Sequence, residues 1–258
     1  MWLFDMRGPW DAFHARLFDL VIGRPVAPLY ERLADRLAPR LPPAGRILDV
    51  GCGAGRPTAQ LARRLPQARV VGIDLSTTQI AIARREHAAQ RNLEFRVGDA
   101  LALPFSDRSF DAAVSLASIK HWPDPQRGVR EMVRVVRPAG LVFLLEVDPD
   151  CSREAAERFV RRWRFVPSPA VPLLVWYFRR FPARQGCTAA DLRRRLEEAG
   201  AVWVEAVRDE QDPAAYAWGF VPEASAGDRA SLDPPGPPDR TAPEGREAAK
   251  GAGRRGPG

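Results

Sequence analysis

The residues whose types and spacing could do chemistry lie at 47–55, where an apolar run ends in a carboxylate and continues into glycines. Asp49 ends the run, and Gly51, Gly53 and Gly55 follow at alternate positions. Short apolar runs are typical of buried parallel strands, and glycine lets a ligand approach the backbone closely. A helical pattern comes next. The stretch therefore predicts a strand, a glycine loop and a helix that bind a ligand against the backbone.

A second carboxylate, Asp74, ends another apolar run nineteen residues after Gly55. Dinucleotide-binding loops have the spacing G-x-G-x-x-G, with an acidic residue ~20 residues further on for the ribose. Here the glycines run G-x-G-x-G, and Asp49 precedes them by two residues. The two oxygens of Asp74 suit the two hydroxyls of a ribose. The glycines alone are weak evidence, and the two carboxylates make the nucleoside interpretation strong.

Four segments, in order, resemble class I S-adenosylmethionine (SAM)-dependent methyltransferases of the small-molecule "type 11" style. They are the first motif at 47–55, the ribose segment at 70–76, the adenine segment at 95–111 and the segment before the fifth strand at 133–141. The resemblance is close over 43–148 and looser to about 222. It implies SAM as the cofactor and a Rossmann-like fold, and it does not identify the methyl acceptor.

The resemblance implies a role for each matched position. The backbone of the glycine loop, with Cys52 as a small side chain inside it, would admit the methionine and ribose portions of SAM. Asp49 would fix the loop and reach the ligand's ammonium group through water. Asp74 would accept from the ribose hydroxyls and Asp99 from the adenine amino group, with the Ala100 N–H on a ring nitrogen. The alternative for Asp49 and Asp74 is loop and helix-cap hydrogen bonding, and for Asp99 it is a Gly-Asp turn. The expected cofactor-binding residues are Asp49, Gly51, Cys52, Gly53, Gly55, Asp74, Leu75, Asp99, Ala100 and Ser115.

The acceptor side is expected directly after the fourth strand, in residues 115–124. Related sequences often carry two adjacent histidines here, and Lys120 stands in the place of the first. His121 could act as a general base because its unperturbed pKa lies near neutrality, or it could pack this loop together with Trp122. Lys120 could orient an anionic acceptor or be solvated. We therefore expect His121 as the candidate catalytic residue, and Lys120 and Trp122 as candidate substrate contacts.

Several other classes of methyl transfer lack their residues in this chain. No Asn-Pro-Pro-Tyr or Asp-Pro-Pro-Tyr follows the fourth strand, and no cysteine lies there to attack a cytosine ring. The paired glutamates of protein-arginine enzymes are not evident, and no constellation of His, Cys, Asp and Glu indicates a metal site. A small-molecule acceptor remains, and no metal is expected.

The elements that must position these residues alternate between strand and helix. Strand patterns lie at 47–50, 69–73, 93–97, 110–115, 141–147, 201–207 and 216–221, and helical patterns at 57–65, 77–91, 127–137, 154–166 and 188–200. Such alternation predicts a doubly wound, mostly parallel α/β sheet with helices on both faces. Ligands then bind at the carboxyl ends of the strands. By resemblance the sheet has seven strands, and the last strand is antiparallel.

The predicted organisation is one domain over 1–222, followed by a tail over 223–258. The domain would begin with helices in 1–42 and carry an insertion over 151–187. The tail is rich in proline and glycine and lacks aromatic residues, so it cannot bury enough apolar surface to order itself. Aromatic residues and arginines alternate in the insertion. This pattern suits an amphipathic lid, a nucleic-acid surface or a membrane-surface contact, and we favour the lid.

The composition sets the remaining bounds. The net charge of +7 comes almost wholly from arginine, since Lys120 and Lys250 are the only lysines. Three cysteines cannot build a disulfide framework, which favours a reducing, cytoplasmic compartment. No apolar stretch is long enough to span a membrane. Nucleic acid is not expected as a partner, and a membrane-surface contact stays open.

The leading hypothesis is a SAM-dependent methyltransferase acting on O, N or C of a small molecule, and a bulky apolar molecule is the expected acceptor. One alternative is a nucleic-acid methyltransferase, suggested by the arginines and aromatic residues of the insertion. The other is a SAM-binding partner protein without catalysis of its own, suggested by the irregular loop around Lys120.

Overall fold

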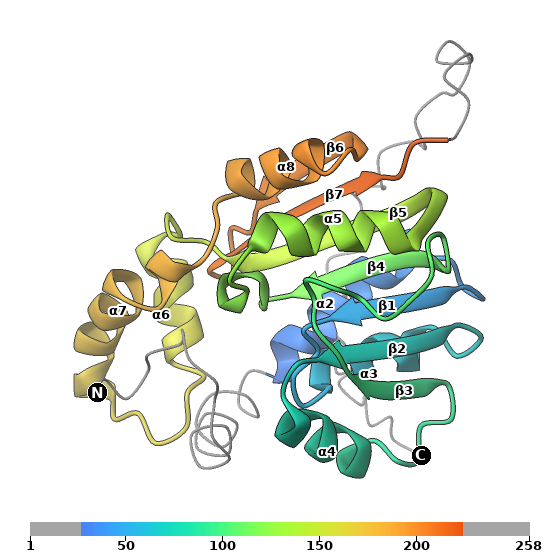
Figure 1. The fold of residues 1–258 in the computed structure, drawn as a ribbon. Helices are drawn as coiled ribbons and strands as arrows, with labels where there is room; N and C mark the ends of the chain where they lie inside the picture. The colour runs from blue at the N-terminus through green and yellow to red at the C-terminus, as the bar shows by residue number, and fades with distance from the viewer. Residues whose placement is uncertain (1–26, 224–258) are drawn as a thin grey trace, which may run out of the picture. The chain divides into compact units, whose positions relative to one another are not determined.

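The computed structural model describes residues 27–223, which form a seven-stranded sheet flanked by helices (Figure 1). The strand order is β3-β2-β1-β4-β5-β7-β6. Their bounds are β1 Arg46–Val50, β2 Arg69–Asp74, β3 Leu93–Val97, β4 Phe110–Leu116, β5 Val136–Val147, β6 Val202–Arg208 and β7 Ala214–Phe220. Strands β1 to β5 pair in parallel, and β7 runs antiparallel to both of its neighbours. The predicted doubly wound, mostly parallel sheet with an antiparallel last strand is confirmed.

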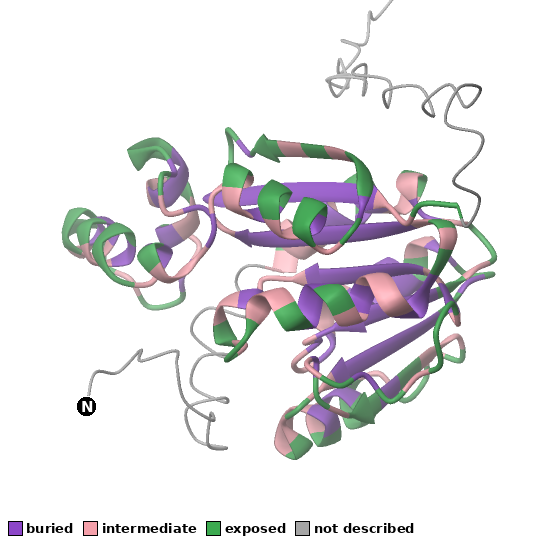
Figure 2. Cartoon of the chain, turned by 45° about the horizontal axis from the view of Figure 1, so that its top comes forward, coloured by how far each residue is buried: buried purple, intermediate pink, exposed green. Residues whose placement is uncertain are grey.

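Helices cover both faces of the sheet, because its strands are apolar on both sides. Helices α2 (Ala27–Leu37) and α3 (Arg56–Arg64) pack on the face that carries Ile47 and Val70. Helices α5 (Pro125–Val135) and α8 (Ala189–Glu198) pack on the opposite face, against a core that includes Leu48 and Val71. Figure 2 shows the central strands of the sheet as largely buried between these helices, and the edge strands β3 and β6 as mostly exposed. Consecutive strand residues thus enter different cores, which fixes the register of the sheet.

Two further groups of elements complete the described chain. Helix α4 (Thr77–Glu86) begins at Ser76, whose hydroxyl accepts from the Gln79 backbone N–H, as its N-cap position predicts. The insertion contains α6 (Arg153–Val160) and α7 (Val171–Arg180), which share a small apolar core of their own. In Figure 1 the two helices lie beyond the carboxyl ends of the parallel strands. They are therefore placed next to the expected ligand-binding edge.

Several predicted boundaries are corrected. The helix expected at 127–137 spans Pro125–Val135, and β5 begins at Val136, because Pro138 disfavours helical geometry at the residue before it. The helices expected at 77–91 and 154–166 end at Glu86 and Val160. The proline-rich stretch before 178 forms a 3-10 turn and then α7, where Pro172 lies in the first turn and needs no hydrogen-bond partner for a backbone N–H.

Part of the predicted organisation lies outside the described residues. This holds for the first N-terminal helical pattern and for the tail beyond Glu223. The second N-terminal pattern corresponds to α2 and a 3-10 turn over Ala38–Arg40. The capping box predicted at Thr188 is present, with its hydroxyl and the Asp191 carboxylate each bonded to the other's backbone N–H.

Candidate functional site

A cavity of about 930 Å³ opens at the carboxyl ends of the parallel strands. Its walls come from α2, the glycine loop after β1, the ends of β2 and β3, the loop after β4, the insertion and the turn before β7. The volume lies at the upper end of the range for small-molecule sites. The topology places these segments together because parallel strands end at one edge of the sheet.

The three glycines of the loop have positive φ angles, and the space around each differs. A Cβ on Gly51 would lie 2.2 Å from the Ser118 Oγ, and a Cβ on Gly55 would lie 2.3 Å from the Phe95 ring. A Cβ on Gly53 would meet no other atom of the described part of the chain within 4 Å, and Gly53 lines the cavity. Gly51 and Gly55 are therefore required by packing within the protein, whereas Gly53 leaves the backbone open to a ligand.

Asp74 connects the glycine loop to the start of α4. One carboxylate oxygen accepts from the Gly53 N–H and the other from the Ser76 N–H, both at 2.9 Å. Burial raises the pKa of Asp74, and these two backbone hydrogen bonds act in the opposite direction. The side chain also lines the cavity, and each of its oxygens has a second lone pair. The loop and cap bonding is thus present, and capacity for ribose hydroxyls remains.

Asp49 lies beneath the loop and is only 1% exposed. One oxygen accepts from the Thr58 hydroxyl at 2.6 Å. The other oxygen is buried and has no hydrogen-bond partner among the described residues. Burial raises the pKa of Asp49 to about 7, with the Asp74 charge adding to the rise. A buried carboxylate oxygen without a donor suits a cationic group or a water placed above the loop.

Residues after β2 and β3 line the next part of the wall. Leu75 is 70% exposed and Ala100 is buried, and both border the cavity. Asp99 is exposed on the same wall, and one of its oxygens accepts from the Leu101 N–H at 2.8 Å. An apolar surface beside a carboxylate suits a flat heterocycle with an amino group. Cys52 is buried in the loop against Gly72, as its small size predicted.

Ser115 is a correction to the predicted cofactor-binding set. It is fully buried in β4, and its hydroxyl shares a 2.8 Å hydrogen bond with the Ser118 hydroxyl. The neighbouring Ser118 borders the cavity instead and donates to the Val50 carbonyl at 2.9 Å. Ser118 follows the end of β4 at Leu116, and it lies between the Ser115 hydroxyl and the cavity. Nothing in the sequence pattern singled out Ser118.

Lys120 is neither solvated nor free to act as a simple surface cation. Its Nζ lies 2.7 Å from a Glu146 carboxylate oxygen and donates to the Ala117 carbonyl at 2.8 Å. The side chain of Lys120 is 3% exposed and that of Glu146 is fully buried. Lys120 nevertheless borders the cavity. The correction has a local reason, because the 3-10 turn over Ile119–His121 folds Lys120 back onto the end of β5.

His121 and Trp122 both border the cavity. His121 is exposed, so a ligand or water can reach its ring. Trp122 packs its ring over α5, where a Cβ on Gly128 would lie 2.4 Å from the ring. The predicted packing role of Trp122 is therefore present together with its position on the cavity wall.

The insertion supplies an aromatic wall opposite the glycine loop. Phe159, Trp163, Tyr177 and Phe178 border the cavity from α6, α7 and the turn between them. The Phe159 ring lies 5.1 Å from the Phe178 ring and 5.9 Å from the Trp163 ring, centroid to centroid. This wall is compatible with the predicted lid and predicts an apolar ligand portion on that side of the cavity.

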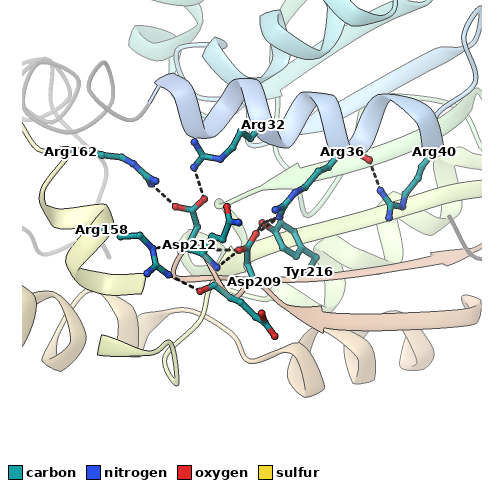
Figure 3. A network of polar contacts seen from close by, with 10 residues as sticks. Arg32, Arg36, Arg40, Arg158, Arg162, Asp209, Asp212 and Tyr216 are labelled. Atoms are coloured by element: carbon teal, nitrogen blue, oxygen red, sulfur yellow. Dashed lines mark hydrogen bonds and ion pairs between the residues drawn. The ribbon is translucent and has the colours of Figure 1, made fainter. Parts of the chain in front are cut away.

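An arginine–aspartate network, which sequence reasoning missed, fixes the turn between β6 and β7 (Figure 3). Asp212 borders the cavity, is 2% exposed, and pairs with Arg32 from α2 and Arg162 from the end of α6. Asp209 pairs with Arg36 and accepts from the Tyr216 hydroxyl. Burial alone would raise the pKa of Asp209, and hydrogen bonds from Tyr216 and two backbone N–H groups outweigh it, so its pKa is lowered.

The same network includes backbone contacts. The Arg158 guanidinium donates to the carbonyls of Gln211 and Glu210 at 2.9 and 2.8 Å. The insertion is thereby fixed to the turn by Arg158 of α6 and by Arg162 just after that helix, and α2 is fixed by Arg32 and Arg36. These residues are far apart in the sequence and follow no motif, so no sequence signal could have joined them.

Within residues 27–223 no helix is both long and apolar enough to cross a membrane. No group of three or more His, Cys, Asp and Glu side chains in the same range is placed to hold a metal ion.

The sequence is similar to proteins that are described as methyltransferases. A family model described as "Methyltransferase domain" matches residues 48–144. "O-methyltransferase cnsE" of Penicillium expansum is 33% identical over 175 residues, which are 66% of this chain and 57% of that protein. "Methyltransferase GfsG" of Streptomyces halstedii is 38% identical over 48% of this chain and 46% of that protein. "Demethylmenaquinone methyltransferase" of Deinococcus radiodurans is 39% identical over 42% and 45%, respectively. The chain thus spans about half the length of these relatives.

Solved structures extend the fold comparison over most of the chain. A putative S-adenosyl-L-methionine-dependent methyltransferase of Methanococcus maripaludis aligns with a TM-score of 0.65 at 18% identity, covering 86% of this chain and 99% of that one. A SAM-dependent methyltransferase of Aquifex aeolicus aligns with a TM-score of 0.58 at 15% identity, covering 83% and 100%. At these identities the likeness concerns the fold.

Proposed function

We propose that this protein, whose residues 48–144 belong to the methyltransferase domain family, transfers a methyl group from SAM to a small molecule. One observation carries the proposal. A single cavity joins a loop with exposed glycine backbone and carboxylates on one side to an apolar, aromatic wall on the other. The first side suits a nucleoside with a charged amino-acid portion, and the second suits an apolar acceptor.

The family and cofactor inferred from residues 47–55 and the segments that follow are confirmed. The matched model is a methyltransferase domain, and aligned structures are SAM-dependent methyltransferases. SAM is therefore the cofactor that the domain implies, and the residues present fit it. Gly53 leaves the backbone accessible, and Asp49 offers a buried oxygen that has no donor within residues 27–223.

In this proposal the residues of the chain bind and orient the cofactor and the acceptor, and they exclude water from the site. Asp74 holds the glycine loop against α4 and accepts from the ribose hydroxyls, while Asp99 accepts from the adenine amino group. Asp49 stabilises the ammonium of the amino-acid portion from below the loop. Bound SAM supplies an electrophilic sulfonium methyl with a good leaving group. Proximity, alignment and desolvation are then the main contributions of the protein.

The acceptor would occupy the part of the cavity bordered by α2, the loop after β4 and the insertion. Its walls there are Leu29, Tyr30, Leu33, Leu116, Leu145, Val147, Phe159, Trp163, Tyr177 and Phe178. This composition supports a bulky apolar molecule as the acceptor. His121 borders the same region and would accept a proton from an acceptor hydroxyl or amine, if the acceptor is not already ionised.

Calorimetry tests the cofactor side with SAM and S-adenosylhomocysteine. Asp74→Ala removes both the loop anchor and the expected ribose contact. A hydrogen bond that involves a charged group is worth about 1.5–3 kcal/mol, so affinity should fall roughly tenfold to hundredfold. Asp35→Ala is the matched control, because Asp35 is an exposed carboxylate on α2 paired with Arg64. A folded wild-type protein that binds neither compound would refute the proposal.

A nucleic-acid acceptor is the second candidate, favoured by the arginines of the insertion. Three of them are already engaged, since Arg158 binds backbone carbonyls, Arg161 pairs with Glu157 and Arg162 with Asp212. Methyl transfer to host RNA that decreases steeply with salt would favour this candidate. Tight cofactor binding without transfer to any extract would favour a non-catalytic partner protein.

A further inference from the structure

A buried ion pair lies where the acceptor would bind. Lys120 follows β4 and Glu146 lies near the end of β5. Lys120 and the strand neighbours of Glu146, Leu145 and Val147, border the cavity. The pair is therefore next to an apolar wall, with its lysine side facing the cavity.

The hydrogen bonds between Lys120, Glu146 and their neighbours use two of the three N–H groups of Lys120 Nζ. One Glu146 oxygen accepts from Lys120 Nζ and from the Val147 N–H, and the other accepts from the Lys120 backbone N–H at 3.2 Å. Glu146 is thus well satisfied and fixed in position. Lys120 Nζ has three N–H donors, and it bonds to Glu146 and to the Ala117 carbonyl. Its third N–H has no acceptor among the described residues.

Stability does not account for this arrangement. Burying two charges costs several kcal/mol, and replacing a buried ion pair by apolar residues of similar volume is often neutral or stabilising. A third N–H left without a partner adds to the cost of burial. An ion pair at the wall of a ligand cavity is better explained by a ligand that completes it.

We propose that Lys120 is a substrate-binding residue whose third N–H donates to an oxygen atom of the methyl acceptor. The acceptor class is an apolar molecule that carries a carbonyl or an ionisable hydroxyl oxygen. Glu146 is the positioning residue that holds Lys120 in place. The inference rests on the proposed function, because it takes this compartment as the acceptor site.

Two probe compounds of nearly the same shape test the inference without methyl transfer. 2-Naphthol carries the oxygen and 2-methylnaphthalene lacks it. Both are titrated into the full chain saturated with S-adenosylhomocysteine, and the ratio of their affinities is measured. The comparison protein is Lys120→Met combined with Glu146→Gln, which removes both charges and keeps an oxygen that can accept from the Val147 N–H.

The ratio of affinities should fall about tenfold to hundredfold in the double variant, the range expected for a hydrogen bond to a charged donor. The affinity for 2-methylnaphthalene and for S-adenosylhomocysteine should stay the same, which shows that the fold and the cofactor side are intact. Arg193→Met is the matched control, because it removes an exposed cation on α8 and should leave the ratio unchanged.

Two results would overturn the inference. One is an unchanged ratio in the double variant, which would mean that water satisfies the third N–H. The other is a wild-type protein that binds S-adenosylhomocysteine but neither probe, which would mean that the apolar wall does not accept such molecules. A wild-type protein that does not bind S-adenosylhomocysteine would instead refute the proposed function. The failures of the two proposals are therefore distinguishable.

Discussion

The raised pKa of Asp49 predicts how the stability of the ligand-free protein depends on pH. The carboxyl group has a pKa of about 7 in the folded state, against a reference of 3.8. Between these values the folded protein keeps a proton that the unfolded chain has released, so stability falls as pH rises through this window and levels off above about pH 7. A shift of about three pKa units corresponds to about 4 kcal/mol.

Asp49→Asn removes this titration and keeps an oxygen that can accept from the Thr58 hydroxyl. The free energy of unfolding is measured with urea between about pH 4 and pH 8, without ligand, for wild type and variant. The difference between the two proteins should change by about 4 kcal/mol across the range, in favour of the variant at high pH. The amide also lowers the free energy of unfolding by an amount that does not depend on pH. The reason is that its NH2 group replaces the carboxylate oxygen that had no partner among the described residues, and is then buried without an acceptor. A difference that stays flat with pH would show that Asp49 titrates normally and would refute the reasoning.

The pH dependence of ligand affinity is a second test of the role of Asp49. An ammonium group near Asp49 favours its charged form, so the affinity for SAM should rise as pH increases towards and through 7. The related compound 5′-methylthioadenosine lacks the amino-acid portion, and its affinity should not change with pH through Asp49. Equal pH dependence for both ligands would mean that Asp49 does not act on the ammonium.

The remaining predictions concern the acceptor side and the arginine network. His121→Gln should leave SAM affinity unchanged and lower kcat by about 10²–10⁴-fold if His121 is a general base, with loss of the acid limb of the pH–rate profile; an unchanged profile would leave His121 a packing residue. Arg162→Met removes one of two cations from the buried Asp212 carboxylate and should cost about 1–3 kcal/mol in urea unfolding. Arg161 pairs with the half-exposed Glu157, so Arg161→Met should lower the free energy of unfolding by at most about 0.5 kcal/mol. Equal losses of unfolding free energy for the two substitutions would show that burial of Asp212 does not strengthen its ion pair with Arg162.

The sequence was informative where local pattern and chemistry coincide. The alternation of apolar strands and helices predicted the sheet, and Asp49, Asp74 and Asp99 are placed at its ligand-binding edge or just beneath it, as expected. Ser115 does not reach the cavity, because Ser118 from the turn after β4 covers its hydroxyl and borders the cavity instead.

Other features depend on contacts between distant segments. The partner of Lys120 is Glu146 from β5, and the partners of Asp212 come from α2 and from the turn after α6. Helix ends were also wrong where prolines and turns follow, because periodicity continues past the point at which the backbone leaves the helix. Such features follow from tertiary packing, which no spacing in one sequence encodes.

The arginines that fix α6 to the turn before β7 also have a consequence for how acceptor preference can diversify. The insertion has its own apolar core, and through the network it is anchored by Arg158 and Arg162 to a turn of the sheet. Its cluster also packs against Leu29 and Tyr30 of α2. Under the proposed function, the lining of the acceptor site could therefore change with the insertion while the glycine loop stays the same, provided that the new segment still packs on α2 and brings a cation for Asp212.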